Sequence, residues 1–168
     1  MQQANISVEN DTTYLDEARQ YLTFMLGGKV YGLEILNIKE IIELGEITEV
    51  PMMPDFIAGV INLRGSVVPV IDLSRRFSGM ATVIAKRTSI VILEVENEDL
   101  RIEIGVLVDM VNEVLDICQS DIEPAPSLGS KIQTNFMSGM AKVDGKLLLL
   151  LNIENVLSVD ELSMVGGM

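Results

Sequence analysis

Carboxylates are the most numerous reactive groups in this sequence, and two of their pairings have spacings that chemistry can use. Glu94 and Glu96 stand two residues apart, close enough for a general acid and a general base. Asp109 and Glu113 stand four residues apart, which on a helix would put two metal ligands on one face. With 25 acidic residues in the chain, and no histidine or cysteine partner for either pair, we interpret both as solvated surface. We expect no catalytic residue, no metal site and no cofactor.

Histidine and cysteine, which take part in many enzyme mechanisms, are nearly missing from this sequence: it has no histidine and one cysteine. The sequence has no histidine, which excludes Ser-His-Asp and Cys-His mechanisms, histidine metal sites and phosphate transfer through histidine. The one cysteine, Cys118, follows apolar residues and is predicted to be a small packing residue. A lone cysteine forms no intrachain disulfide and suits a reducing compartment. The N-terminus has neither a basic region nor an apolar signal core, so we expect a cytoplasmic protein.

Length and charge narrow the class of protein further. The chain has 168 residues, 48% of them hydrophobic and 22% charged, the balance of a folded globular chain. Its net charge of −13 should repel phosphate backbones and anionic lipids, so we expect neither nucleic-acid binding nor direct membrane insertion. No apolar run approaches the ~18 residues of a spanning helix.

The elements that must position any site are short strands joined by tight turns. Apolar, strand-like runs flank turn residues at four places, namely 27–28, 62–65, 97–99 and 143–146. Long helical periodicity is scarce, and short helices are expected only after Asp72 and Asn152, which are suitable N-caps. The first 20 residues are polar and are predicted to be a loose lead-in, helical near Leu15–Arg19.

The sequence also contains an internal repeat. Residues 32–42 align with residues 105–115 at an offset of 73, with a glycine, a glutamate and the aliphatic positions in common. Residues 56–65 align with residues 136–145 at an offset of 80, with a phenylalanine and two glycines in common. We interpret the repeat as a duplication that produces two β units of about five strands each. Short strands and glycine turns favour SH3-like or OB-like barrels, and units this small should share a packed seam.

Three residues are harder to explain by the fold alone. Arg64 is at a hairpin tip in a chain poor in basic residues. It is either a solvated turn residue or an anchor on a partner surface, where arginine is enriched. Ile38 and Val114 each follow a junction between a strand and a turn. They belong either to a core or to the lining of a groove between the two units.

Several runs of residues together resemble the CheW family of bacterial chemotaxis coupling proteins. The similarity covers about residues 20 to 160, and the Asn-Leu-Arg-Gly segment with its flanks is its most specific part. The matching runs are Tyr31-Gly32-Leu33-Glu34-Ile35 with Glu40-Ile41, Val50-Pro51 with Pro54, Phe56-Ile57, Gly59-Val60-Ile61-Asn62-Leu63-Arg64-Gly65 with Val67-Val68-Pro69-Val70-Ile71-Asp72-Leu73, Gly105-Val106-Leu107-Val108-Asp109 with Val111 and Glu113-Val114-Leu115, and Leu149-Leu150-Leu151-Asn152-Ile153.

The resemblance implies a mainly β fold of two SH3-like five-stranded β-barrels packed together, with short helices. Residues 21–160 would form this domain, with the first barrel centred on 21–85 and the second on 86–160. Residues 1–20 would be the lead-in and residues 161–168 a C-terminal tail.

The resemblance also implies a non-enzymatic adaptor. Such a protein joins the cytoplasmic tips of methyl-accepting chemotaxis receptors to the regulatory domain of the histidine kinase CheA. It works in the cytoplasm, at membrane-associated chemoreceptor arrays.

Site residues follow from the same resemblance. The receptor-binding positions it implies are Ile38, Glu40, Arg64, Val111 and Val114. For the kinase it points to the first barrel, over Glu43–Val50 and the strand Val67–Val70, and so to Glu43, Val50, Val67, Val68 and Val70.

Two other classes of function stay open at this point. A small-ligand-binding β-barrel protein would agree with the high aliphatic content and would have one enclosed apolar cavity. An enzyme that uses carboxylates alone is the third reading. Co-sedimentation with a receptor fragment and the kinase would favour the adaptor, and saturable binding of a small metabolite would favour the ligand-binding protein.

Overall fold

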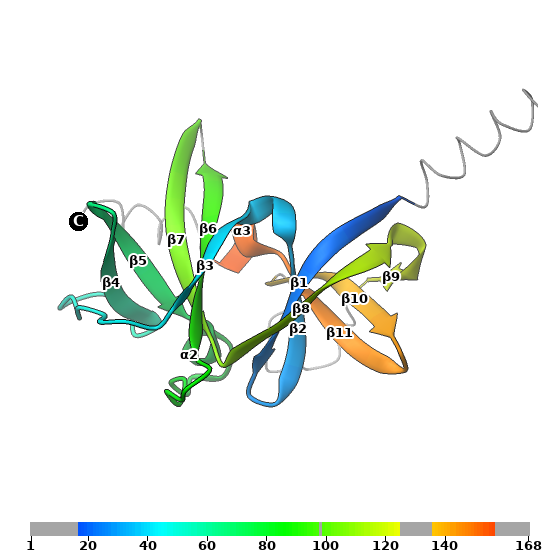
Figure 1. Cartoon of the computed structure of the whole chain (residues 1–168), viewed down its shortest axis with the longest axis horizontal. Coiled ribbons are helices and arrows are strands. Elements are labelled where there is room, and N and C mark those ends of the chain that lie inside the picture. Colours follow the sequence, from blue (N-terminus) through cyan, green and yellow to red (C-terminus); the bar gives the residue numbers. More distant parts are fainter. Residues whose placement is uncertain (1–16, 98, 125–135, 157–168) are drawn as a thin grey trace, which may run out of the picture.

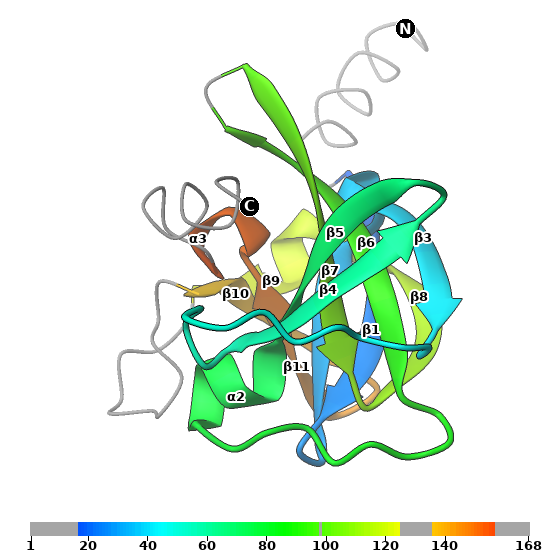
Figure 2. The same cartoon turned by 90° about the vertical axis from the view of Figure 1, so that its left-hand side faces the viewer.

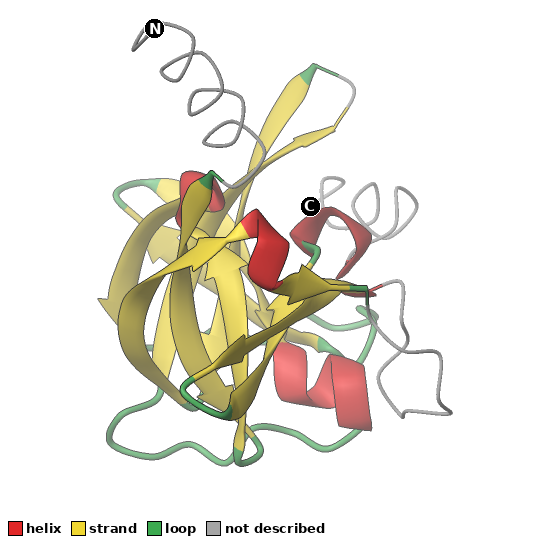
Figure 3. Ribbon diagram, turned by 90° about the vertical axis from the view of Figure 1, so that its right-hand side faces the viewer, coloured by secondary structure: helices red, strands yellow, loops and turns green. Residues whose placement is uncertain are grey.

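The computed structural model describes residues 17–97, 99–124 and 136–156, and most of their regular structure is β-strand, with only short helical turns (Figures 1 and 3). The predicted mainly β class is confirmed. The strands are β1 (Ala18–Leu26), β2 (Lys29–Glu34), β3 (Ile38–Glu43), β4 (Ile57–Leu63), β5 (Ser66–Asp72), β6 (Ser89–Asn97), β7 (Leu100–Val108), β8 (Met110–Cys118), β9 (Ile122–Glu123), β10 (Met137–Val143) and β11 (Lys146–Leu151). The helices are α2 (Leu73–Ser78), α3 (Ile153–Val156) and the 3-10 turns η1 (Ile35–Asn37) and η2 (Gln119–Asp121).

The strands form two sheets, which we call barrel A and barrel B. Barrel A has the strand order β8-β1-β2-β11-β10-β9, and barrel B has the order β3-β6-β7-β5-β4. In each barrel one pair of neighbouring strands is parallel, β2 with β11 in A and β5 with β7 in B. The other neighbours are antiparallel. The predicted pair of packed β units is confirmed.

The two barrels share one strand order, as the internal repeat requires. Strands β3, β6, β7, β5 and β4 take the places in barrel B that β8, β1, β2, β11 and β10 take in barrel A. The register repeats as well. Gly105 is paired with Val70 across β7 and β5, and Gly32 is paired with Leu150 across β2 and β11. The repeat in the sequence is therefore also a repeat in the pairing of the strands.

Gly59 and Gly139, which match at the offset of 80, each allow a neighbouring backbone segment to pack closely against the edge of a barrel. A Cβ atom on Gly59 would lie 2.3 Å from the carbonyl oxygen of Thr48, and Gly59 has a φ of 149°. A Cβ atom on Gly139 would lie 2.8 Å from the carbonyl oxygen of Glu123. In barrel A that passing segment is long enough to form β9, whereas in barrel B it makes one isolated bridge at Thr48. In the described part of the chain, barrel A therefore has six strands where five were predicted.

The chain is divided between the barrels differently from the prediction of 21–85 and 86–160. Strands β1 and β2 belong to barrel A with β8–β11, and strands β6 and β7 belong to barrel B with β3–β5. Each repeat thus lends its first hairpin to the barrel of the other. The chain first passes from barrel A to barrel B between β2 and β3. The three-residue η1 joins these two strands, and β3 continues into barrel B and does not fold back beside β2.

The N-terminal prediction also needs a correction. Strand β1 begins at Ala18 and pairs with the end of β8, so residues 18–20 are strand and not part of a helical lead-in. The remaining lead-in, residues 1–16, and the predicted tail, residues 161–168, lie outside the described residues.

The largest hydrophobic cluster lies between the barrels and is built mainly from the exchanged hairpins. Leu22 and Leu33 come from β1 and β2, and Val91 and Val106 come from β6 and β7; all four are buried. We call this cluster the seam core. The barrel interiors hold two smaller clusters, one around Val70 in barrel B and one around Leu150 in barrel A. The predicted shared seam is confirmed, and separating the barrels would expose most of the core.

Candidate docking surface

Strand β3 places two aliphatic side chains on the side of barrel B that faces the seam. Ile38 is opposite Leu93 of β6, and both pack in or against the seam core. Ile41 is opposite Val91, another seam-core residue. Directly opposed residues of an antiparallel pair project from the same face of the sheet. Ile38 and Ile41 therefore border the seam from barrel B.

Strand β8 repeats this arrangement on barrel A. Val111 is opposite Phe24 of β1, and Val114 is opposite Leu22. Phe24 and Leu22 both belong to the seam core, and Val111 packs against it. Figures 1 and 2 show β3 and β8 on the same side of the molecule, towards the viewer in Figure 1 and to the right in Figure 2. We call the surface made by Ile38, Ile41, Val111 and Val114 the seam face.

The seam face combines partly buried and exposed apolar groups. Ile41 is 44% exposed and Val114 is 48% exposed, whereas Ile38 and Val111 are half-buried. Large apolar side chains that stay exposed on both sides of a seam suit the docking of a partner. Ile41 was missed by the sequence-based list. The repeat was the signal that could have found it, because the offset of 73 aligns Ile41 with Val114.

The polar candidates lie elsewhere on barrel B and contact each other. Arg64 Nη2 donates to Glu40 Oε1 at 2.5 Å. Glu40 is opposite Ile92, a residue of the interior cluster, because a register shift at Lys39 separates it from Ile38. Glu40 therefore points towards the interior side of β3 and not towards the seam face. Since β3 and β4 are the two ends of the strand order, the ion pair joins one edge of the barrel to the hairpin at the other edge.

The residues predicted for kinase binding divide by burial. Glu43 is exposed, Val67 is 66% exposed and Val50 is partly exposed. Val68 is 1% exposed and Val70 is 0% exposed, and both pack in the interior of barrel B. Including Val68 and Val70 in a docking surface was wrong, because a partner cannot touch side chains that the folded barrel encloses.

In the pair considered for metal binding, the carboxylate of Asp109 and the backbone of Glu113 have structural partners. Asp109 lies between β7 and β8, where its Oδ2 accepts a hydrogen bond from the Gly27 amide at 2.8 Å. Glu113 lies on strand β8 and not on a helix, and its backbone amide donates to the Thr23 hydroxyl at 3.1 Å. Within the described part of the chain, no three His, Cys, Asp or Glu side chains gather in a way that suits a metal ion.

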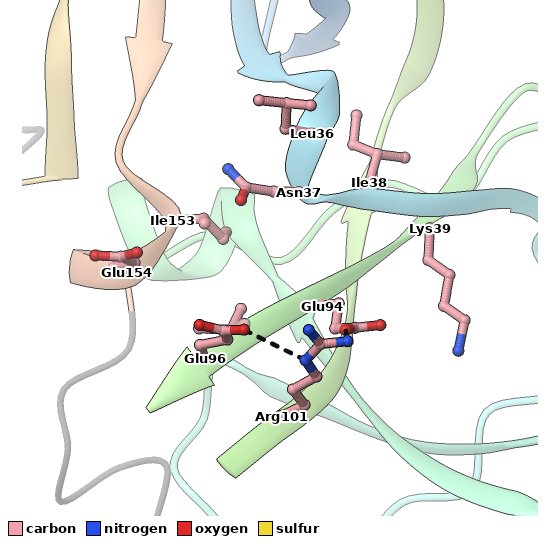
Figure 4. A pocket seen from close by; sticks show the side chains of 10 residues that line it. Leu36, Asn37, Ile38, Lys39, Glu94, Glu96, Arg101, Ile153 and Glu154 are labelled. Atoms are coloured by element: carbon pink, nitrogen blue, oxygen red, sulfur yellow. Dashed lines mark hydrogen bonds and ion pairs between the residues drawn. The ribbon is translucent and has the colours of Figure 1, made fainter. Parts of the chain in front are cut away.

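A hollow of about 410 Å³ lies between η1, the β6–β7 hairpin and α3 (Figure 4). Charged side chains supply much of its lining, and Arg101 Nε donates to Glu96 at 3.3 Å while its Nη1 lies 3.2 Å from Glu94 Oε1. Lys39 and Glu154 add further charge to the walls. A small-ligand-binding barrel was expected to enclose an apolar cavity, and this hollow lacks that chemistry.

Two tyrosines, Tyr21 and Tyr31, have pKa values above the ordinary value of 10.0. Burial raises the pKa of Tyr31, a seam-core residue, above its ordinary value of 10.0. Burial also raises the pKa of Tyr21, and a hydrogen bond with Gln119 opposes that shift. Both shifts favour the neutral phenol at neutral pH, so neither tyrosine supplies charge to a site.

Comparison with known proteins adds to this geometry. The model of the CheW-like domain family matches residues 20–161. The chemotaxis protein CheW of Klebsiella aerogenes is 35% identical over 149 residues, which are 89% of this chain and 87% of that protein. The CheW of Bacillus subtilis is 33% identical over 146 residues, or 87% and 91% of the two chains. The crystal structure of the scaffolding protein TtCheW from Thermoanaerobacter tengcongensis matches with a TM-score of 0.77 at 35% identity, over 86% of this chain and 90% of that one. None of the helices in the described part of the chain has the length and apolarity to span a bilayer.

Proposed function

The chain belongs to the CheW-like family of chemotaxis scaffolding proteins, and from this membership we propose that it couples transmembrane chemoreceptors to the histidine kinase CheA. In this role it catalyses no reaction. It holds the two partners together in the cytoplasm, at membrane-associated receptor arrays, so that the receptor controls the activity of the kinase. The observation that carries the proposal is the seam face, where two barrels present aliphatic side chains along one border.

We propose that the cytoplasmic tip of the receptor docks on the seam face. The tip is a helical hairpin, and an amphipathic helix binds by laying its apolar side on a matching apolar surface. Ile41 and Val114 are exposed enough to be buried by such a helix, while Ile38 and Val111 extend the contact towards the seam core. Arg64, whose side chain is 67% exposed, contributes from barrel B at the rim of the contact, and Glu40 contributes through the ion pair that holds Arg64.

The regulatory domain of the kinase is assigned in this proposal to the remaining exposed candidates on barrel B. Glu43 and Val67 are exposed and Val50 is partly exposed. The valines provide apolar contacts and Glu43 provides a polar one, and interfaces combine an apolar centre with a polar rim. Separate surfaces for the two partners allow one chain to hold both at once.

Reconstitution tests the proposal directly. Vesicles that carry a receptor are mixed with the kinase, with and without this chain, and autophosphorylation of the kinase is measured with and without the receptor's ligand. We expect receptor-dependent activity only when the chain is present, and we expect the chain to sediment with receptor and kinase together. Equal, ligand-sensitive activity in its absence would overturn the proposal. Saturable binding of a small metabolite with no effect on the kinase would do so as well.

A further inference from the structure

Arg76 of α2 makes a group of directional contacts that no element of the proposed function uses. Its guanidinium carbon lies 4.2 Å from the ring centroid of Phe56 and 5.0 Å from that of Phe136. Its Nε donates to the carbonyl oxygen of Val156 at 3.0 Å. Val156 belongs to α3, which follows β11 of barrel A.

These contacts join the two barrels. The carbonyl of Phe56 accepts from the Asp72 amide at 2.7 Å, at the end of β5 in barrel B. The carbonyl of Phe136 accepts from the Asn152 amide at 2.8 Å, just after β11 in barrel A. Arg76 extends from α2, which follows β5, and so belongs to barrel B. Its guanidinium therefore lies between an aromatic ring of its own barrel and one of the other barrel.

The repeat shows that the site is at the centre of the pseudo-symmetry. Phe56 and Phe136 are equivalent at the offset of 80, and the residue equivalent to Arg76 is Val156 itself. The two equivalent phenylalanine rings therefore lie near the same guanidinium. One repeat supplies this cation, Arg76, and the other supplies the carbonyl of Val156 that accepts its hydrogen bond. Phe77 continues the contact, with its ring centroid 5.6 Å from that of Phe136.

We infer that Arg76 is a positioning residue that holds the angle between the two barrels. The seam core is a cluster of apolar side chains, and apolar contact is not directional, so by itself it tolerates small rotations of one barrel on the other. A planar guanidinium between two rings, with one donor on a fixed carbonyl, tolerates much less rotation. Because the seam face is formed by both barrels, Arg76 also holds the spacing of the surface on which Ile38 and Val114 lie.

A distance measurement between the barrels tests the inference without any partner, and so independently of the proposed function. Cys118 is replaced by serine, and the exposed repeat-equivalent residues Ser66 and Lys146 are replaced by cysteines for spin labels, one in each barrel. Pulsed electron spin resonance then gives the distribution of label distances. With Arg76 present we expect one narrow distribution. Arg76→Met should shift it or broaden it by half or more, and Arg76→Lys should give an intermediate width, because it keeps the charge but loses the planar group.

Arg75→Ala is the matched control. Arg75 is on the same short helix and carries the same charge, but its guanidinium lies 3.8 Å from Asp55 of the same barrel. The control should leave the distance distribution unchanged. An unchanged distribution in folded Arg76→Met would overturn the inference, as would equal broadening in Arg75→Ala. If Arg76→Met fails to fold, the comparison of Arg76→Lys with the control decides in the same way.

Discussion

Replacing Val114 by glutamate tests the seam face at its most exposed aliphatic residue. Val114 is 48% exposed in the free protein, so a charge there stays in water and the fold loses little. In a complex with a receptor helix the same position is covered. We therefore expect Val114→Glu to weaken receptor binding while kinase binding and the melting temperature change little.

The size of the effect follows from the exposed fraction. Full burial of a valine side chain contributes about 1.5–3 kcal/mol, so covering the exposed half contributes about 1 kcal/mol. A carboxylate covered without a partner costs at least about 1 kcal/mol more. The sum of about 2 kcal/mol corresponds to a loss of affinity of roughly 30-fold. Val114→Lys should lose a similar amount, because the cost comes from removing a charge from water and not from the sign of that charge.

The assay is titration of a receptor cytoplasmic fragment with each variant, followed by titration with the kinase. Leu147→Glu is the control, because Leu147 is 57% exposed and lies opposite Lys142 of β10, a strand that contributes no residue to the seam face. Receptor binding by Val114→Glu at wild-type affinity would refute the seam face, and so would an equal loss in Leu147→Glu. Ile38 is less suitable for a charge, since it packs against the seam core, and Ile41→Glu is the better test on barrel B.

Three further results are expected. Arg64→Ala should melt within a few degrees of wild type, because an exposed ion pair with Glu40 contributes about 0–1 kcal/mol, yet it should lower receptor-dependent kinase activation; a large drop in melting temperature would make Arg64 structural. Val67→Glu should lower kinase affinity at an unchanged urea midpoint, whereas Val68→Ala should cost about 2 kcal/mol of stability; wild-type kinase affinity in the first variant would remove Val67 from the docking surface. Above about pH 10 stability should fall as pH rises, because burial raises the pKa of Tyr31 and the unfolded chain loses that proton first. In urea titrations Tyr31→Phe should flatten this fall, and an identical pH slope would contradict the assignment.

The local features of the fold were readable from the sequence because they depend on neighbouring residues. Alternating apolar residues specify strands, and glycines or Asn/Asp pairs specify the turns between them. The Gly27-Gly28 turn joins β1 and β2, with φ of 55° and 82°. Asp72 caps α2 by accepting from the Arg75 amide at 3.2 Å. The internal repeat also predicted a tertiary feature. Two pairs of matching segments, at offsets of 73 and 80, indicated that the chain forms two similar β units.

Which strands pair was decided by tertiary structure alone. The apolar residues of β2 indicate that one face of the strand is buried, but they do not indicate which sheet covers that face. The same is true of β7. The exchange of hairpins places both strands at the centre of the seam core, where each is buried against the other barrel. The division of the chain into 21–85 and 86–160 assumed that neighbours in sequence are neighbours in space, and the parallel pairs β2–β11 and β5–β7 break that assumption.

Part of the candidate site was likewise predictable from the sequence, and part depended on the pairing of strands. Sequence and resemblance together selected Ile38, Val111 and Val114, which the repeat and the register place along one seam. They also selected Glu40, which strict alternation would put on the face of Ile38, but the register shift at Lys39 turns it towards the interior of barrel B. A shift of one residue reverses every later side chain on a strand, and it depends on the partner strand as much as on the strand's own residues. The sequence therefore determined which residues form β3, and the pairing with β6 determined which of them a partner can reach.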